Sequence, residues 1–145
     1  MRIGLDIHGV IDRDPDIFSM LSKWMRANGH EVHVLTGKEL SLNLYDELRK
    51  FGIEYDRLFS ITSFHKDTGV EVKYKGGDPT QPLIEPRLWN PTKADYCKWM
   101  GIGVHIDDSS CYGKYFVGRT KYIIYTPAIR IMLQYILKGA FVCKH

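Results

Sequence analysis

Short apolar runs alternate along this chain with longer segments in which apolar residues recur every three or four positions. The short runs are typical of strands buried in a parallel sheet, and the longer spacing is typical of helices with one apolar face. The predicted strands lie within 1–12 and over 31–35, 57–62, 103–106 and 122–125. The predicted helices cover 15–27, 40–51, 91–100 and 127–139. This alternation predicts an α/β fold with a Rossmann-like, three-layer, doubly wound parallel sheet of about five strands.

Cap and stop residues mark the ends of the predicted helices. Asp14-Pro15 offers an N-cap followed by proline at the first helical position, and Gly101 offers a stop for the helix over 91–100. The last helix is expected to end at Gly139. Its residues that we expect to pack inward are Ile129, Met132, Leu133, Ile136 and Leu137.

Residues 64–91 interrupt the alternation with a polar stretch that is punctuated by glycine and proline. A connection of this length is usually functional or disordered. Val70, Val72 and Tyr74 alternate with charged residues, which predicts a small hairpin within it. We therefore predict one domain over 1–145, with a small insertion at about 64–91.

The composition fits one globular domain. The chain has 145 residues, of which 44% are hydrophobic and 26% are charged, enough to build a core. Cys97, Cys111 and Cys143 show no close pairing, and the amino end carries no apolar signal segment, so we expect a cytoplasmic protein. No stretch is long and apolar enough to span a membrane, so no membrane partner is expected.

The net charge of +3 is unevenly distributed. After Asp108 the chain has no acidic residue, so residues 1–108 carry a net charge of −3. The basic residues beyond that point are Lys114, Arg119, Lys121, Arg130, Lys138 and Lys144. The aromatic residues interleaved with them are Tyr112, Tyr115, Phe116, Tyr122 and Tyr125. Charge combined with stacking would suit a nucleotide or a nucleic acid, and solvated lysines beside a buried strand are the simpler alternative.

Carboxylates follow two of the predicted strands. Asp6 stands at the expected carboxyl end of the first strand, and Asp107 and Asp108 follow the strand over 103–106. Parallel strands bring their carboxyl ends to one edge of the sheet, where α/β proteins bind ligands. Adjacent carboxylates repel one another unless a cation lies beside them, and Mg²⁺ prefers such oxygen ligands. The pattern therefore indicates a Mg²⁺ site, and the alternative for Asp6 is that it only caps the following turn.

Further residues indicate an anion at the same edge. Thr36 and Gly37 follow the second predicted strand, and Lys93 lies in the first turn of a predicted helix. The amino terminus of a helix favours anions, so a lysine there suggests that both are directed at a shared anion such as phosphate. The alternative is an exposed lysine that bends into water.

The order of these segments resembles that of the haloacid dehalogenase superfamily of phosphotransferases. The matching residues are 4–12, 34–37, Lys93 and 105–109, and the resemblance covers nearly the whole chain apart from 64–91. It implies that Asp6 attacks phosphorus to form an aspartyl phosphate. It also implies that Thr36, Gly37 and Lys93 bind the phosphoryl group. The residues that it implies for the Mg²⁺ site are Asp6, His8 through its backbone carbonyl, Asp107 and Asp108.

His8 departs from the family pattern, in which an Asp-x-Asp motif supplies the general acid and base at this position. An imidazole can do acid and base work near neutral pH, although a neighbouring Mg²⁺ would weaken it as an acid. Two interpretations follow. The first is a Mg²⁺-dependent phosphomonoester hydrolase with His8 as acid and base, acting on nucleotides, other phosphorylated small molecules or polynucleotide ends. The second is a module that binds phosphate and metal but turns over slowly or not at all.

Overall fold

The computed structural model describes the backbone of residues 1–142 and the side chains of residues 1–140, so Cys143 and Lys144 lie outside the described residues. Its centre is a five-stranded sheet in which all neighbouring strands are parallel, in the order β3-β2-β1-β6-β7. The strands are β1 (Arg2–Asp6), β2 (Glu31–Thr36), β3 (Arg57–Ser60), β6 (Val104–Asp107) and β7 (Lys121–Ile124). The predicted α/β class and Rossmann-like parallel sheet are confirmed.

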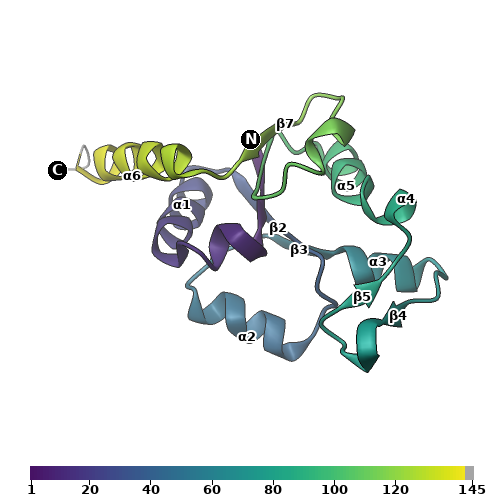
Figure 1. Ribbon diagram of the computed structural model, residues 1–145. Coiled ribbons are helices and arrows are strands. Elements are labelled where there is room, and N and C mark those ends of the chain that lie inside the picture. The colour runs from purple at the N-terminus through teal and green to yellow at the C-terminus, as the bar shows by residue number, and fades with distance from the viewer. Residues whose placement is uncertain (143–145) are drawn as a thin grey trace.

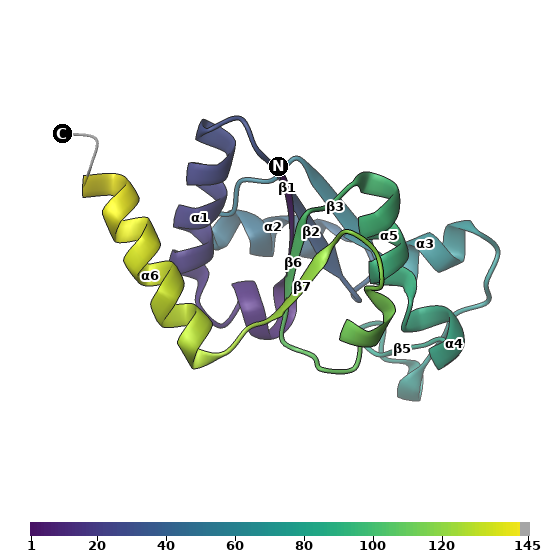
Figure 2. The same cartoon turned by 90° about the horizontal axis from the view of Figure 1, so that it is seen from above.

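Helices cover both faces of this sheet (Figures 1 and 2). One face carries α1 (Pro15–Ala27), α2 (Leu42–Lys50) and α6 (Pro127–Val142). The other carries α5 (Thr92–Met100), and α3 (Ile61–Asp67) and α4 (Pro86–Trp89) lie on that side in Figure 2. The larger core lies under the first group of helices, and the smaller one, under α5, consists of Leu35, Tyr96, Cys97 and Ile102. None of the described helices is long and apolar enough to cross a membrane.

The winding of the chain reverses beside β1. The chain proceeds from β1 through β2 to β3, returns through α5, and adds β6 on the other side of β1. The register pairs Gly4 with His105 and Leu5 with Ile106, so the carboxyl ends of β1 and β6 lie next to each other. A reversal of this kind leaves a crevice outside the carboxyl ends of the two strands, which is where ligands bind in such folds.

Most predicted helix boundaries are confirmed. Pro15 begins α1, and Gly101 ends α5 in the left-handed conformation at φ +63°. Asp14 occupies the N-cap position of α1, but its side chain makes no capping hydrogen bond. Instead its carboxylate accepts a hydrogen bond from Tyr125 and pairs with Arg130, which ties the start of α1 to the start of α6.

The predicted end of the first strand at Asp6 is confirmed, but the third predicted strand is too long. After Asp6, residues Ile7–Ile11 form the turn η1, in which His8 and Gly9 depart from helical geometry and Gly9 takes φ +73°. The third ends at Ser60, whose hydroxyl accepts a hydrogen bond from the backbone N–H of Ser63 and caps α3. A local side-chain cap therefore overrides the β propensity of the residues that follow it.

The segment over 64–91 has more regular structure than predicted. Its first residues belong to α3, and a short hairpin of β4 (Lys73–Tyr74) and β5 (Pro82–Leu83) follows. Val70 and Val72 lie outside the hairpin strands, so only Tyr74 of the predicted alternation belongs to one. The hydroxyl of Tyr74 donates a 2.6 Å hydrogen bond to Glu39, which ties the hairpin to the loop after β2.

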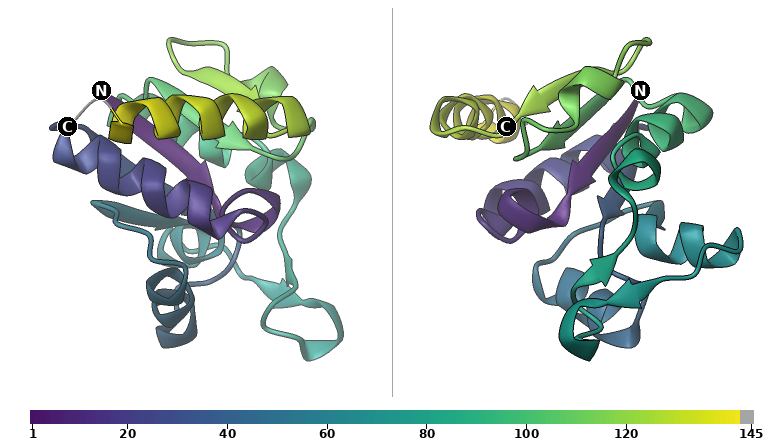
Figure 3. Two further views of the ribbon diagram at one scale, coloured as in Figure 1. Left: turned by 90° about the vertical axis from the view of Figure 1, so that its left-hand side faces the viewer. Right: turned by 45° about the vertical axis from the view of Figure 1, so that its right-hand side comes forward.

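The prediction for the last helix is partly wrong. Leu137 is buried, and Ile129 and Leu133 pack against the core as expected. Met132 and Ile136, however, are 46% and 54% exposed, and the helix continues past Gly139 to Val142. Figure 3 shows α6 at the periphery of the fold, beside α1. The apolar pattern of this helix is wider than the face that the rest of the chain covers.

Candidate active site

The site lies where β1 and β6 end. Asp6 is the last residue of β1 and Asp107 is the last residue of β6, and the pairing of the two strands brings these residues to the same edge. Asp6 is 5% exposed and Asp107 is fully buried. Burying two carboxylates is costly unless cations or hydrogen-bond donors compensate them. The prediction that carboxylates meet at this edge is therefore matched by the geometry.

Lys93 supplies part of that compensation. It lies in the first turn of α5 and is 4% exposed. Its Nζ donates to Asp6 Oδ1 at 2.9 Å and to Asp107 Oδ2 at 2.6 Å. The ring of Tyr112 lies 5.2 Å from the same nitrogen. Lys93 is therefore not the exposed lysine of the simpler alternative, because it bridges the two carboxylates.

Asp108 adds a third carboxylate. It is exposed, and one oxygen from each of Asp6, Asp107 and Asp108 can be chosen so that all three lie within 4.8 Å of one another. Gly9 leaves room for it, since a Cβ at that position would lie only 2.1 Å from Asp108 Oδ2. Three hard oxygen donors from two strand ends match the ligands that Mg²⁺ prefers.

The charges of this cluster are unevenly compensated. Burial raises the pKa of Asp6 to about 6, and repulsion from Asp107 adds to the effect while Lys93 opposes it. Burial also disfavours the charge of Asp107, but the hydrogen bond from His105 and the charge of Lys93 keep the pKa of Asp107 below its usual range. Burial likewise opposes the charge of Lys93, yet the two carboxylates keep its pKa above the ordinary value. Asp6 is therefore the carboxylate that a bound cation would stabilise most.

His105 is a component of the site that the sequence analysis missed. Its Nε2 lies 3.2 Å from Asp107 Oδ2, and its ring stacks on Phe116 at a centroid distance of 5.6 Å. Burial lowers the pKa of His105, so a neutral ring donates from Nε2 and leaves Nδ1 without a partner among the described residues. The signal was present in the sequence: residues two apart in a strand share a face, so His105 had to lie beside Asp107.

Thr36 and Gly37 follow β2, the other neighbour of β1. Thr36 is fully buried, and its Oγ1 accepts a 3.1 Å hydrogen bond from the backbone N–H of Lys38. The carbonyl of Gly37 accepts a 2.6 Å hydrogen bond from Thr62. A Cβ on Gly37 would lie 2.8 Å from the Trp89 ring, so the backbone passes close to α4. Thr36 shares this edge with Asp6 and Lys93, but no hydrogen bond among the described residues joins it to either of them.

The imidazole of His8 is not part of the carboxylate cluster. Its Nδ1 lies 3.2 Å from Asp12 Oδ2, and the side chain is 47% exposed. The other oxygen of Asp12 accepts a 2.7 Å hydrogen bond from the backbone N–H of Gly9. Asp12 therefore holds both the His8 ring and the η1 backbone, a role that the sequence analysis did not assign to it. The His8 side chain thus lies outside the three-carboxylate cluster, and the metal contact through the His8 backbone carbonyl stays a prediction.

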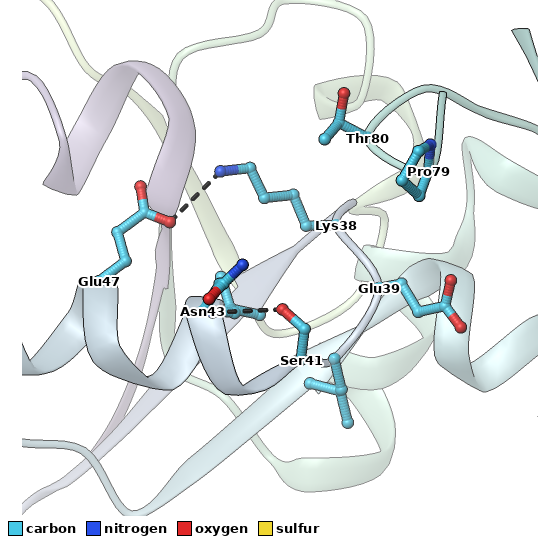
Figure 4. Close-up of a pocket in the computed structure, with 9 residues that line it drawn as sticks. Lys38, Glu39, Ser41, Asn43, Glu47, Pro79 and Thr80 are labelled. Atoms are coloured by element: carbon cyan, nitrogen blue, oxygen red, sulfur yellow. Dashed lines mark hydrogen bonds and ion pairs between the residues drawn. The ribbon is translucent and has the colours of Figure 1, made fainter. Parts of the chain in front are cut away.

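A cavity of about 290 Å³ opens beside the loop after β2 (Figure 4). Its wall contains Lys38, Glu39, Leu40, Ser41, Asn43, Leu44, Glu47, Pro79 and Thr80. Lys38 donates from Nζ to Glu47 at 3.3 Å, so this cation already has a carboxylate partner. The cavity is formed by the loop after β2, by α2 and by the hairpin loop. None of the three clustered carboxylates lines it, and Lys38, which does, donates its backbone N–H to Thr36.

The basic carboxyl-terminal region differs from the sequence-based expectation in one respect. Lys114, Arg119 and Lys121 are exposed, as expected. Most of the interleaved aromatic rings, however, face the protein: Phe116 and Tyr122 pack around His105, and Tyr125 is buried. The region therefore offers positive charge but few free rings for stacking on bases.

Neither a protein-family model nor a curated protein matches this chain. The chemistry that the site can support follows from its own atoms. It combines a carboxylate with one oxygen not engaged by Lys93, a buried ammonium group, and two further carboxylates suited to a hard divalent cation. Such a set can bind a phosphate ester together with a metal ion and can present a nucleophile to it.

Proposed function

We propose that this protein is a Mg²⁺-dependent phosphomonoester hydrolase that acts through an aspartyl phosphate on Asp6. The observation that carries the proposal is the buried contact of Lys93 with Asp6 and Asp107, next to a third carboxylate, at the β1–β6 edge. A nucleophilic carboxylate must approach a dianionic phosphate, so it needs positive charge on both sides of the reacting group. Lys93 provides one positive charge there.

The donor set fits Mg²⁺. Asp6, Asp107 and Asp108 would hold the ion, and the phosphate and water would complete its oxygen shell. Lys93 engages Oδ1 of Asp6 and Oδ2 of Asp107, which leaves the second oxygen of Asp6 without a donor among the described contacts. When bound, Mg²⁺ would neutralise phosphate charge and relieve the repulsion among the carboxylates.

The proposed reaction has two steps. In the first, an oxygen of Asp6 bonds to phosphorus, the ester P–O bond breaks, and the leaving oxygen takes a proton. In the second, water cleaves the acyl phosphate, which releases inorganic phosphate and restores the Asp6 carboxylate. Lys93 would hold a phosphoryl oxygen, and the Thr36 hydroxyl and the Gly37 backbone would orient the others at the neighbouring strand end.

His8 is the proposed general acid and base. The contact with Asp12 orients its ring at Nδ1 and leaves Nε2 for the substrate. Exposure of the side chain is compatible with this role, because the leaving group must lie on the solvent side of the phosphate. Asp12 would then act as a positioning residue for His8.

The proposed substrates are phosphorylated small molecules, among them nucleotides, with polynucleotide ends as a further class. The cavity between the loop after β2, α2 and the hairpin loop offers room for the group attached to the phosphate, and the polar side chains of Lys38, Ser41 and Asn43 form part of its wall. The exposed Lys114, Arg119 and Lys121 would attract a polyanion. The inward-facing aromatic rings favour the small-molecule class over a nucleic acid that binds by stacking.

The second candidate is a module that binds phosphate and metal without efficient turnover. One observation favours it: position 8 carries an imidazole that contacts Asp12 and does not belong to the cluster of three carboxylates. In this case the site would keep its ligands but lack an effective proton donor for the leaving group.

Phosphate release from a substrate panel tests the proposal. The panel contains p-nitrophenyl phosphate, nucleotides, sugar phosphates and 5′-phosphorylated oligonucleotides, each with Mg²⁺ and with chelator. We expect Mg²⁺-dependent turnover that Asp6→Asn abolishes and that Asp67→Asn, on an exposed carboxylate of α3, leaves intact. Phosphate and Mg²⁺ binding without release from any substrate would support the second candidate, and turnover that persists in Asp6→Asn would contradict both.

A further inference from the structure

Helix α6 is apolar around most of its circumference. Between Ala128 and Gly139 its charged and amide residues are Arg130, Gln134 and Lys138. They are spaced by four, so they form one narrow polar strip along the helix. A helix of a monomeric protein usually carries one apolar stripe and one polar face, whereas a helix that is apolar nearly all round is buried on more than one side.

The fold itself covers only one of these apolar sides. Leu137 is buried at 1% exposure, and Ile129 and Leu133 pack against the same core. These three residues are also spaced by four and belong to the core that contains the buried residues of α1, beside which α6 lies in Figures 1 and 2. The ion pair between Arg130 and Asp14, at 3.0 Å, fixes the first turn of the helix. The residues that fix the orientation of α6 on the rest of the fold are therefore distinct from the other apolar residues of this helix.

The other apolar side is exposed. Ile131 is 53% exposed, Met132 46%, Tyr135 76% and Ile136 54%. Their spacing makes them neighbours on the helix surface, and we call these four residues the outer apolar stripe. The helix lies at the outer limit of the fold, and the stripe contains no charged residue (Figures 1 and 3). Single exposed apolar residues are common on proteins, but a contiguous row of four large ones marks an interaction surface.

We propose that a second copy of this chain covers the outer apolar stripe, with α6 packed against α6 of the partner about a two-fold axis. The exposed apolar area of the stripe is on the order of 400 Å² per copy, which is about half of the ~800 Å² per partner in a standard interface. An uncharged stripe of this kind is self-complementary, as a two-fold contact requires. The area places the dimer at the weak end of specific interfaces, with dissociation in the micromolar range.

The polar strip distinguishes this partner from a lipid surface. Helices that lie on membranes carry many lysines and arginines opposite their apolar face. The polar strip of α6 has only Arg130 and Lys138, and Arg130 is already paired with Asp14. In the dimer the polar strip stays in solvent, and only the outer apolar stripe loses contact with water.

Sedimentation velocity between about 1 and 200 µM tests the proposal, because this range brackets a micromolar dissociation constant. We expect the wild-type chain to shift from 16.8 kDa toward twice that mass as its concentration rises. Ile131→Glu/Tyr135→Glu should remain monomeric throughout, because it buries four carboxylates in the paired stripes. Leu42→Glu is the matched control, since Leu42 is 83% exposed on α2, away from the stripe, and should dimerise like the wild type.

Thermal unfolding at low concentration shows whether the double variant is folded, and Tyr135→Ser provides a milder variant that should weaken the dimer at least tenfold. A wild-type chain that stays monomeric at the highest concentration would overturn the proposal, as would a double variant that dimerises like the wild type. Flotation with anionic phosphatidylserine vesicles is the remaining arm. Binding of a monomeric wild-type chain that the double variant loses would assign the stripe to a lipid surface and would also overturn the proposal.

Discussion

Asp6 is held in a place where its negative charge is only partly compensated. Burial raises its pKa to about 6 from the 3.8 of a free aspartate, and the neighbouring Asp107 adds to the shift. The folded, metal-free protein therefore binds the Asp6 proton more tightly than the unfolded chain does. Protonated Asp6 therefore contributes to the free energy of unfolding below about pH 4, and this contribution is lost as the pH rises to about 6. Since the charged Asp6 carboxylate lowers the stability of the metal-free protein, a cation that neutralises it would bind favourably.

Asp6→Asn should therefore stabilise the metal-free protein. At pH 7 with chelator we expect its free energy of unfolding to exceed that of the wild type by about 1–3 kcal/mol, because the variant lacks the charge but keeps an acceptor for Lys93. The gain should vanish toward pH 4. Urea unfolding across this pH range measures it, with Asp67→Asn as the control. A variant less stable than the wild type at pH 7 would contradict this view of Asp6.

His8 distinguishes the two candidate functions. If it protonates the leaving group, His8→Ala should reduce turnover of an alkyl phosphate by roughly 10²- to 10⁴-fold and affect p-nitrophenyl phosphate much less, since nitrophenolate leaves without a proton. Asp12→Asn should produce a smaller loss with the same substrate dependence, because the amide oxygen can still accept from the Gly9 backbone N–H while the contact with the His8 ring is weakened. Steady-state rates on the two substrates measure both effects.

Equal rates of the wild type and His8→Ala on the alkyl phosphate would remove His8 from the mechanism. Faster turnover in His8→Asp than in the wild type would favour the module that binds phosphate and metal, because it would mean that only the proton donor is missing. Either result leaves the prediction for Asp6 unchanged.

At the scale of elements, η1 follows the end of β1 and passes close to Asp108 at Gly9. Gly9 adopts φ +73° there, and a Cβ would lie 2.1 Å from an Asp108 oxygen. Gly29, at φ +78°, is in a similar conformation, but a Cβ at that position would meet no atom within 4 Å. The two glycines thus share their backbone conformation and differ in their surroundings.

Gly9→Ala should lower the affinity for Mg²⁺ at least tenfold, because it displaces Asp108. Gly29→Ala should incur a similar backbone cost, of about 1 kcal/mol, without changing the affinity. Calorimetric titration with Mg²⁺ and thermal unfolding of both variants separate the two effects. Equal Mg²⁺ affinities in the two variants would show that Asp108 does not hold the ion.

Elements whose ends are set by local chemistry could be predicted from the sequence. Pro15 and Gly101 mark helix ends because of their own backbone preferences, and both predictions are confirmed. The strand predicted over 57–62 is too long because the Ser60 hydroxyl caps a helix. The β-branched residues after Ser60 are typical of strands, so the sequence pattern did not indicate this helix start. The outward direction of Met132 and Ile136 was missed for another reason: an apolar pattern does not specify which of two sides the same chain covers.

At the scale of the whole molecule, the strand order explains how much of the site could be predicted. Alternating strands and helices already implied that Asp6, Thr36 and Asp107 would share one edge, and they do. The contacts that complete the site join distant segments: Lys93 to Asp6 across 87 positions, and Tyr112 over Lys93. The register between β1 and β6 and the depth of α5 on the sheet determine these contacts, and no local pattern encodes them. His105 is the exception, since the period of a strand places it beside Asp107.

Fluorine NMR with beryllium fluoride tests the central claim most directly, because this tetrahedral phosphoryl mimic binds an aspartate nucleophile and needs no knowledge of the natural substrate. We predict protein-bound fluorine resonances in the wild-type chain when Mg²⁺ is present. They should be absent with chelator and absent in Asp6→Asn, and Asp67→Asn should give the wild-type spectrum. A wild-type chain without bound resonances in saturating Mg²⁺, or an Asp6→Asn variant that gives the same resonances, would contradict the assignment of Asp6 as the phosphoryl acceptor.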